Sequence, residues 1–337
     1  LVGSEMCIRD SRCGDRMILT VTPNPSLDRT LEMPGRLERG EVQRATATRS
    51  EAGGKGINVS RVIAEAGIAT RALLPARDGD PLLRALDAVD LPYETVAVDG
   101  EIRSNITIAE PDGTTTKLNA PGQQLTDAQL VAFTDLVERH AAGASWVTLC
   151  GSLPPGMPVD WYRRLVDDLA DVGCRIAVDT SGAPLHAAAL GRVDLLKPNE
   201  DELAEVTGAD AAALRRSAAE GRFGPIVDAA RSIVDRTGGA VLATLGATGA
   251  ILTTTDGSWF ATPPPIVPRS TVGAGDSSLA GYLIAQSRDL SAPERLRSAV
   301  AYGSAAAALA GTQAPTPDQL DLAGVRITEL TGATRVT

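Results

Sequence analysis

The stretch that decides the fold is WVTLCGSLPPGMPVDWYRRLVDDLADVGCRIAVD, residues 146–179. Its first five residues, 146–150, form an apolar run typical of a buried strand, and residues 174–179 form a second such run. Between them, residues 161–173 repeat apolar positions with the period of a helix and end on a glycine. A strand, a helix and a strand in this order predict a parallel βαβ unit with a right-handed connection.

The same alternation extends along most of the chain. Further strands are predicted over residues 17–22, 193–197 and 240–245, and further helices over residues 56–67, 200–208, 226–239 and 275–286. Strands and helices that alternate at this spacing build a mainly parallel sheet with helices on both faces. The predicted fold class is therefore α/β.

Two segments, residues 29–50 and 92–120, interrupt this alternation. They are rich in β-branched residues and turn signals and lack helical periodicity, so we expect a small separate β-sheet, a lid over the carboxyl ends of the main strands. The predicted domain spans residues 17–330. Residues 1–16 carry no core pattern and are expected to be an extension outside it, with Met17 as the native start.

Composition excludes several classes of protein. With 43% hydrophobic and 22% charged residues, the chain of 337 residues is globular, and no apolar run is long enough to span a membrane. A net charge of −10 argues against nucleic acid or an anionic membrane as a partner. Four cysteines without disulfide or metal spacing indicate a reducing cytoplasm. An anionic substrate would therefore need a local cluster of positive groups.

The sharpest chemical signal is STVGAGDSS, residues 270–278. Gly273 and Gly275, on either side of Ala274, permit a tight turn that opens a helix, and a helix N-terminus can hold an anion. Asp276 sits where that helix begins, and an aspartate at such a position can also simply cap the helix. No Lys follows the glycines as a Walker A loop requires, and the position near the C-terminus does not suit a dinucleotide fingerprint.

Two further loops follow strands near the N-terminus. In EAGGKGINVSR, residues 51–61, glycines expose backbone, Lys55 supplies charge and Asn58 lies in the first turn of a helix, so a phosphate or sugar hydroxyls could dock there. A plain glycine hinge is the alternative. In TPNPSLD, residues 22–28, a turn after a strand presents Asp28 where α/β sheets bind ligands, although aspartate is also common in turns.

The later loops carry weaker signals. In LLKPNEDEL, Asn199 and Glu202 have the spacing for a water-mediated Mg²⁺ beside phosphates, and equally the spacing of a capping box. The segment GSLPPG adds Ser152 after a strand, and ATLGATGA, residues 243–250, adds another glycine turn. The two histidines, at positions 140 and 186, have no partners at ligand spacing, so no zinc or Ser/His/Asp site is predicted.

Seven motifs together carry a resemblance to a known family. In this order they are TPNPSLD, AGGKGINVSR, GSLPPG, VDTSG, KPNEDEL, TLGATG and STVGAGD. The chain from Met17 to about Thr316 resembles the ribokinase-like (PfkB) carbohydrate kinases. The resemblance implies a three-layer α/β/α domain with a β-sheet lid, a homodimer formed through that lid, and phosphorylation of a sugar-phosphate hydroxyl with ATP and Mg²⁺.

The resemblance also implies roles for individual residues. Asp276 is the catalytic base, beside an anion hole of Gly273, Ala274 and Gly275. The implied sugar residues are Asp28, Gly54, Lys55 and Asn58, and the implied substrate-phosphate residues are Arg103 and Ser152. Because Lys55 is one of only three lysines in the chain, we also expect it to clamp that phosphate together with Arg103 and Ser152. The implied nucleotide residues are Lys197, Asn199, Thr244, Gly246, Gly249, Val300 and Ser304, with Glu202 linked to Mg²⁺.

Within the family, GGKG and KLNAPG favour fructose 1-phosphate or tagatose 6-phosphate as the substrate. Glu41 stands where a related 6-phosphofructokinase has a lysine, which weighs against fructose 6-phosphate without excluding it. A non-catalytic sugar-phosphate sensor on this fold is the alternative of another class, and the presence of Asp276 argues against it. A dehydrogenase would need its fingerprint at the first strand, where TPNPSLD stands.

Overall fold

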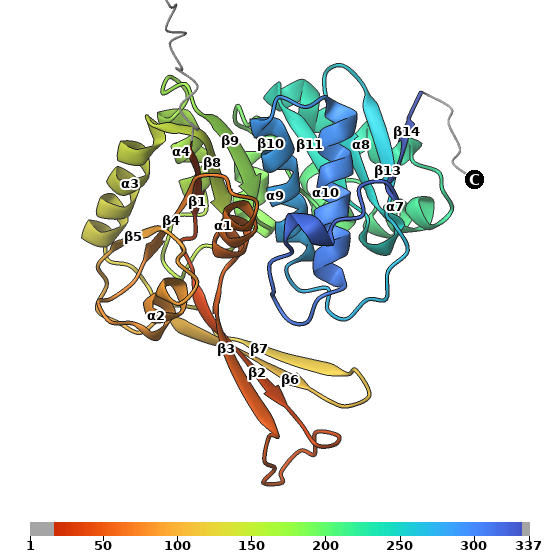
Figure 1. Ribbon diagram of the computed structural model, residues 1–337. Coiled ribbons are helices and arrows are strands. Elements are labelled where there is room, and N and C mark those ends of the chain that lie inside the picture. The colour runs from red at the N-terminus through yellow and green to blue at the C-terminus, as the bar shows by residue number, and fades with distance from the viewer. Residues whose placement is uncertain (1–16, 332–337) are drawn as a thin grey trace, which may run out of the picture.

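The computed structural model describes residues 17–331, so the predicted extension over residues 1–16 lies outside the described residues. Within that range a large sheet has the strand order β14-β13-β12-β11-β10-β9-β8-β1-β4-β5 (Figure 1). Its strands are β1 (Met17–Val21), β4 (Thr70–Pro75), β5 (Tyr93–Val96), β8 (Ala144–Cys150), β9 (Arg175–Asp179), β10 (Leu195–Leu196), β11 (Ala240–Thr244), β12 (Ala250–Thr253), β13 (Ser258–Thr262) and β14 (Arg326–Glu329). The strands from β5 to β11 run parallel and the last three antiparallel, so the predicted mainly parallel sheet is confirmed.

The helices cover both faces of this sheet. They are α1 (Lys55–Glu65), α2 (Pro81–Asp87), α3 (Asp127–Ala141), α4 (Trp161–Asp168), α5 (Gly182–Ala188), α6 (Glu200–Thr207), α7 (Ala211–Ala219), α8 (Gly224–Thr237), α9 (Ala274–Ser287) and α10 (Ala292–Ala307), with short 3₁₀ turns η1 (Gly246–Thr248) and η2 (Pro317–Gln319). Successive residues of a strand point to opposite faces. Ile18 accordingly joins the core beneath α1, α9 and α10, and Leu19 the core beneath α3, α4 and α8. The result is the expected three-layer α/β/α arrangement.

A second sheet of four strands extends away from the large one (Figure 1). Its order is β3-β2-β6-β7, formed by β2 (Ser26–Glu32), β3 (Ala47–Gly53), β6 (Arg103–Ala109) and β7 (Thr115–Asn119). We call this sheet the lid. The expectation that residues 92–120 all lie in the small sheet is wrong for β5, which pairs with β4 at the edge of the large sheet. Burial of Leu91 and Tyr93 against α2 favours that position.

The two faces of the lid differ in chemistry because side chains alternate along each strand. One face carries Asp28 and its cross-strand partners Glu51 and Asn105. The opposite face carries the half-exposed aliphatic side chains of Leu31, Ile106, Ile108 and Leu118, together with exposed Arg29, which lies opposite Ile106. The four strands of the lid therefore present one polar face and one largely apolar face.

The carboxyl ends of the parallel strands bring the chemical loops together. β1 leads into lid strand β2, which carries Asp28 on a strand and not in the expected turn. β8 is followed by the Ser152 loop, and β9 ends on Asp179. Cys150 at the end of β8 lies in register with Asp179, which brings these ends to one edge of the sheet. Among residues 17–331, no helix has the length and apolar character that crossing a bilayer requires.

Candidate active site

The GAGD turn opens helix α9, as predicted. Gly273 is the residue before the helix and has φ 79°, a left-handed conformation that glycine adopts without a steric penalty. The first N–H groups of a helix have no acceptor inside it, so the turn presents donors to an anion. If Gly275 carried a β-carbon, that carbon would lie 3.4 Å from Lys197 Nζ, so the lysine adds positive charge at the same point.

Asp276 is a buried carboxylate and not a helix cap. It lies in the first turn of α9, yet this helix has no capping hydrogen bond from a side chain. Its Oδ2 instead accepts a hydrogen bond of 2.8 Å from Asn58 Nδ2, on helix α1. Asp276 is 7% exposed, so the capping interpretation does not account for its position.

Asp179 is the central charged residue that sequence reasoning missed. This fully buried carboxylate lies 2.7 Å from Lys55 Nζ through Oδ1 and 3.1 Å from Lys197 Nζ through Oδ2. Burial alone would raise its pKa, but the two ammonium groups outweigh that effect and lower the pKa below its usual value. The motif VDTSG contains this aspartate, and its place at the end of a parallel strand was the signal that could have found it.

The same cluster shifts the pKa values of its other members. Burial alone would lower the pKa of Lys55, but the negative charges of Asp179 and Asp276 outweigh it and raise that pKa above its usual value. Burial raises the pKa of Asp276 and Asp179 adds to the rise, whereas Lys55, the Asn58 hydrogen bond and Lys197 oppose it. A carboxylate with a raised pKa is a better proton acceptor than an exposed one, as a general base requires.

Of the predicted sugar-side residues, Asp28 lies on the polar face of the lid, whereas Lys55 and Asn58 lie on α1. Asp28 Oδ1 accepts hydrogen bonds from Ser26 Oγ at 2.7 Å and from Asn105 Nδ2 at 3.0 Å. A β-carbon on Gly53 would lie 2.3 Å from the Asp28 carboxyl carbon, so glycine there makes room for this carboxylate. Gly54, the residue before α1, has φ 122° and leads into Lys55 and Asn58.

Among the buried polar atoms that lack a partner in residues 17–331 are two amide oxygens beside the site carboxylates. They are Asn105 Oδ1, beside Asp28, and Asn58 Oδ1, beside Asp276. A buried polar atom left without a hydrogen bond is costly, so such atoms in a site are typical of groups that a ligand satisfies. Asn105 was not among the predicted residues; its position in register with Asp28 is visible only once the lid is paired.

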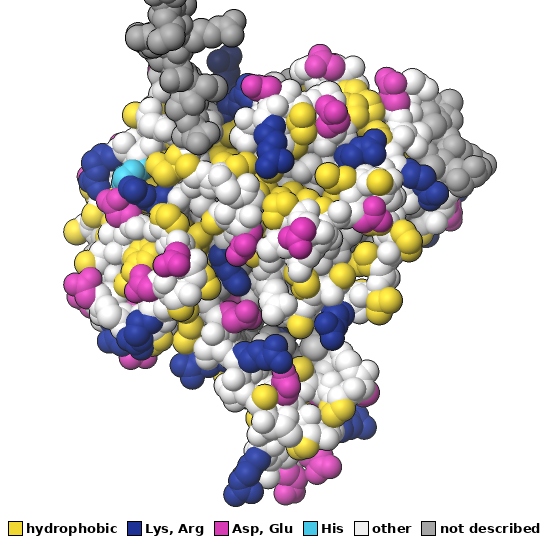
Figure 2. Space-filling model, in the orientation of Figure 1, with side chains coloured by type: hydrophobic (Ala, Val, Ile, Leu, Met, Phe, Trp, Pro, Cys, Tyr) yellow, Lys and Arg dark blue, Asp and Glu magenta, His cyan; other side chains and the backbone are white. Residues whose placement is uncertain are grey.

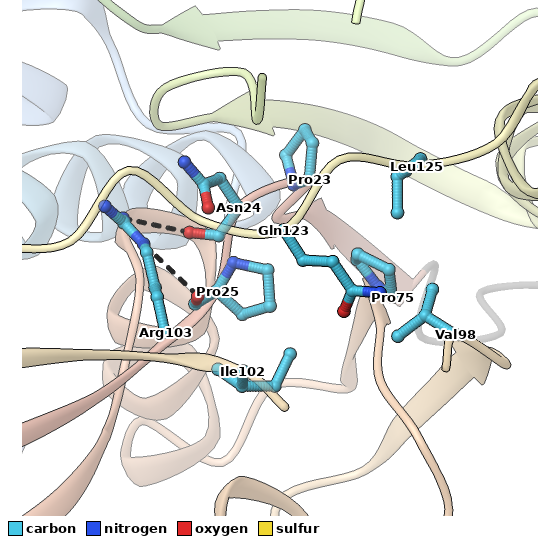
Figure 3. Close-up of a pocket in the computed structure, with 9 residues that line it drawn as sticks. All are labelled: Pro23, Asn24, Pro25, Pro75, Val98, Ile102, Arg103, Gln123 and Leu125. Carbon is cyan, nitrogen blue, oxygen red and sulfur yellow. Dashed lines mark hydrogen bonds between the residues drawn. The ribbon is translucent and has the colours of Figure 1, made fainter. Parts of the chain in front are cut away.

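Arg103 and Ser152 meet through Asn24, at the base of the lid. Arg103 donates to the carbonyl oxygens of Asn24 at 3.0 Å and Ala120 at 2.9 Å, and Asn24 Nδ2 donates to Ser152 Oγ at 3.2 Å. Figure 3 shows Arg103 beside Asn24 and Pro25 at a small pocket. Burial lowers the pKa of Arg103, and the charge of Asp28 offsets part of that effect.

The structure does not place Lys55 with Arg103 and Ser152 as one three-residue clamp. The ammonium group of Lys55 bonds to Asp179, while its β-carbon lies 3.8 Å from where a β-carbon on Gly151 would be. Lys55 therefore lies between the Ser152 loop and Asp179. On the face seen in Figure 2, acidic and basic side chains are interspersed.

The nucleotide-side residues lie along the edge formed by β10 and β11. Asn199 and Glu202 form a reciprocal capping box at the start of α6, which explains both residues without a metal. Thr244 forms a β-bridge with Asn199. Gly246 begins the turn η1, and Gly249 has no room for a β-carbon, which would lie 2.0 Å from the Ala261 carbonyl oxygen.

Val300 and Ser304 both lie on α10. Both are buried, and Val300 belongs to the core beneath α9, so packing accounts for its type. The negative charge of Glu202 makes the smallest contribution to the raised pKa of Lys55, behind those of Asp179 and Asp276. Within residues 17–331 no group of three or more metal-ligating side chains occurs. The donor set still fits Mg²⁺ carried by a nucleotide, because such an ion keeps its waters and needs one or two carboxylates besides phosphates.

A three-layer domain with a β-sheet lid, and a buried aspartate beside a glycine turn that opens a helix, define a ribokinase-like phosphotransferase. The chain belongs to the pfkB family of carbohydrate kinases, whose sequence model matches residues 22–319. It is thus a sugar kinase whose acceptor is an alcohol group.

Known relatives narrow the group further. A 1-phosphofructokinase of Rhodobacter capsulatus is 35% identical over 307 residues, which cover 90% of this chain and 94% of the relative. The ATP-dependent 6-phosphofructokinase isozyme 2 of Escherichia coli is 33% identical over 305 residues, 88% of this chain and 94% of the relative. The crystal structure of Escherichia coli phosphofructokinase-2 in complex with substrates and products aligns with a TM-score of 0.82 and 31% identity over 90% of this chain and 96% of that one.

Proposed function

We propose that the protein transfers a phosphoryl group from ATP to fructose 1-phosphate and forms fructose 1,6-bisphosphate. The observation that carries the proposal is the cluster of Asp276, Asn58, Lys55, Asp179 and Lys197 at the GAGD turn. The relative named 1-phosphofructokinase supports the choice of substrate. A buried base, two lysines and a helix N-terminus are the components that phosphoryl transfer requires.

In the proposed reaction each group has a definite task. Bound Mg²⁺–ATP supplies the phosphoryl group and neutralises part of its charge, with Lys197, Asn199 and Glu202 as the residues that would hold it. Asp276 accepts the proton of the attacking sugar hydroxyl, and Asn58 orients that carboxylate. The N–H groups of residues 273–275 and the ammonium groups of Lys55 and Lys197 stabilise the charge on the phosphoryl oxygens.

The sugar would lie between the lid and the GAGD turn. Asp28 and Asn105 each offer an acceptor for its hydroxyl groups, and Arg103 with Ser152 would hold the phosphate it already carries. A charge-assisted hydrogen bond contributes about 1.5–3 kcal/mol, roughly ten- to 150-fold in affinity. We expect, on this basis, that fructose 1-phosphate far outruns free fructose.

A second acceptor, fructose 6-phosphate, is favoured by the relative named 6-phosphofructokinase isozyme 2, and tagatose 6-phosphate is a third. Against fructose 6-phosphate, the position in the lid where a related 6-phosphofructokinase has lysine holds Glu41, an exposed acid that would repel a phosphate. We therefore keep fructose 1-phosphate as the first choice.

A coupled assay of ADP release over these three phosphates, free fructose and ribose tests the proposal. We expect the highest kcat/KM with fructose 1-phosphate and fructose 1,6-bisphosphate as its product by mass spectrometry. Arg103→Ala should raise KM for the sugar phosphate about ten- to 150-fold and leave KM for ATP nearly unchanged. Arg164→Ala, at an exposed position on α4 where the guanidinium pairs with Asp160, is the matched control. Equal turnover of free fructose, or an unchanged KM in Arg103→Ala, would contradict the assignment.

We also propose that two copies associate through the apolar face of the lid. The half-exposed Leu31, Ile106 and Ile108 share that face, next to Leu118, which is 55% exposed. A protein that leaves several aliphatic groups together in water is stabilised when a second copy covers them.

We also propose a cytoplasmic location. The free thiols of Cys150 and Cys174 agree with it, because the cytoplasm keeps thiols reduced.

Ile108→Asp is expected to convert this dimer to a monomer, because it introduces a charge where the apolar faces meet. Thr107→Asp, the neighbouring residue on the polar face, is the control and should leave the dimer intact. Light scattering with size-exclusion chromatography measures the mass of each. A monomeric parent protein, or a dimer in Ile108→Asp, would show that the copies do not meet at this face.

A further inference from the structure

A contact between the lid and the loop after α10 joins residues 261 positions apart. Thr312 Oγ1 donates a hydrogen bond of 3.2 Å to Glu51 Oε2, on lid strand β3. A β-carbon on the neighbouring Gly311 would lie 3.3 Å from the same oxygen, so the carboxylate rests on this loop. The backbone of the loop is held from a third side, because Arg61 Nη1, on α1, donates to the Thr312 carbonyl oxygen at 3.2 Å.

The same threonine lies beside the anion-hole turn. Gly273 has no β-carbon, but one built on its backbone would lie 4.0 Å from Thr312 Cα, so the two residues are close neighbours. Upstream, the N–H groups of Arg269 and Ser270 donate to the Ala307 carbonyl oxygen at 2.8 and 3.2 Å, so the segment leading into the GAGD turn is fastened to the end of α10. We therefore expect a shift of Thr312 to move the neighbouring turn, which would receive the phosphoryl group.

On the lid, Glu51 is the direct cross-strand partner of Asp28. Residues directly opposite each other in an antiparallel pair have their side chains on the same face, about 4.5–5.5 Å apart at Cβ. Any movement of the lid that brings Asp28 onto a sugar hydroxyl therefore moves Glu51 relative to Thr312 by a similar amount. Asp28, which would bind the sugar, and Glu51, which holds the loop, are therefore a cross-strand pair of one sheet and move together.

We propose that Glu51 and Thr312 form a latch that couples sugar binding on the lid to the geometry of the anion hole. The latch rests on the proposed sugar-phosphate kinase function. Glu51 is in this sense a positioning residue, since it acts on the phosphoryl-binding turn through Thr312 and needs no contact with either substrate. Coupling of this kind is reciprocal, so the sugar phosphate tightens nucleotide binding by the same factor by which the nucleotide tightens sugar binding.

The latch predicts a specific loss in Thr312→Val, which keeps the shape of the side chain and removes the donor. The dissociation constant of ADP is measured by titration calorimetry with and without saturating fructose 1-phosphate, and the ratio of the two values is the coupling factor. We expect the factor to be at least tenfold in the parent protein and to fall by about three- to tenfold in Thr312→Val, the contribution of one hydrogen bond. The binding of ADP alone should change little.

Two further variants separate the latch from a general loss of structure. Glu51→Gln keeps an acceptor oxygen for Thr312 and should retain the coupling, whereas Glu51→Ala should lose it. Thr255→Val, in an exposed turn after β12, makes the same chemical change away from the loop and should behave as the parent does. Melting temperatures of all variants are compared, because a structural tie alone would lower the melting temperature and leave the coupling factor unchanged.

The outcomes separate a failure of the latch from a failure of the proposed substrate. If another sugar phosphate of the assay panel proves to be the acceptor, the choice of fructose 1-phosphate fails and the coupling is measured with that acceptor. Absence of coupling in the parent protein, or an undiminished coupling factor in Thr312→Val, overturns the latch. A reduced factor in Thr312→Val together with a retained one in Glu51→Gln supports it.

Discussion

Asp276→Asn is expected to lower kcat by about 10²- to 10⁴-fold, the usual contribution of a lost general base. The amide keeps the size of the side chain and can still meet Asn58, so the fold and the affinity for nucleotide should persist. Because burial raises the pKa of the parent carboxylate, the parent's rate should also fall on the acid side at a higher pH than an exposed aspartate would give. The amide variant should lack this titration.

Steady-state kinetics with the sugar phosphate at saturation measure the change. Asp235→Asn, the same replacement at an exposed position on α8, is the control and should match the parent. Turnover of Asp276→Asn within threefold of the parent would assign the proton transfer to another group and leave Asp276 a structural role.

Asp179→Asn should destabilise the protein by about 3–5 kcal/mol, the range for removing one partner of a buried ion pair. Lys197, whose side chain is 5% exposed, would be left without its carboxylate, whereas Lys55 is 37% exposed and can turn toward water. Most of the loss should therefore come from Lys197. Activity should fall as well, because both ammonium groups lose the carboxylate that positions them.

The pH dependence of this loss has a definite sign. The folded-state pKa of Asp179 is lowered, so its contribution is fully present above the unfolded value of about 4 and disappears as the pH falls through the folded value. Urea unfolding at pH 7 should show the full difference between parent and variant, and unfolding below about pH 4 a smaller one. A difference that grew on acidification would show that Asp179 is not the charged partner of the lysines.

The alternation of strands and helices was predictable because each element carries its own period. The GAGD turn was predictable for a similar reason, since two glycines before a helix are a local signal. Asp276 and Asn58 lie 218 positions apart in the sequence. Each lies in the first turn of a helix, and the topology of the fold brings these two helix starts together.

Other parts of the site have no local signal. Asp179 ends an ordinary strand, and what makes it central is two lysines that come from 124 residues before it and 18 residues after it. Asn105 is a plain strand residue until the pairing of β2 with β6 sets it beside Asp28. The placement of β5 likewise depends on burial against α2, which its four residues do not disclose. Tertiary pairing decides these positions.

The alternation of the lid has an evolutionary consequence. Substitutions at Asp28 or Asn105 act on one face and those at Ile106 or Ile108 on the other, so single mutations can retune substrate choice and assembly independently. A one-residue insertion within β2 or β6 would instead exchange the two faces and destroy both properties together. The strands of this sheet should therefore tolerate drift in residue type far better than any change in length.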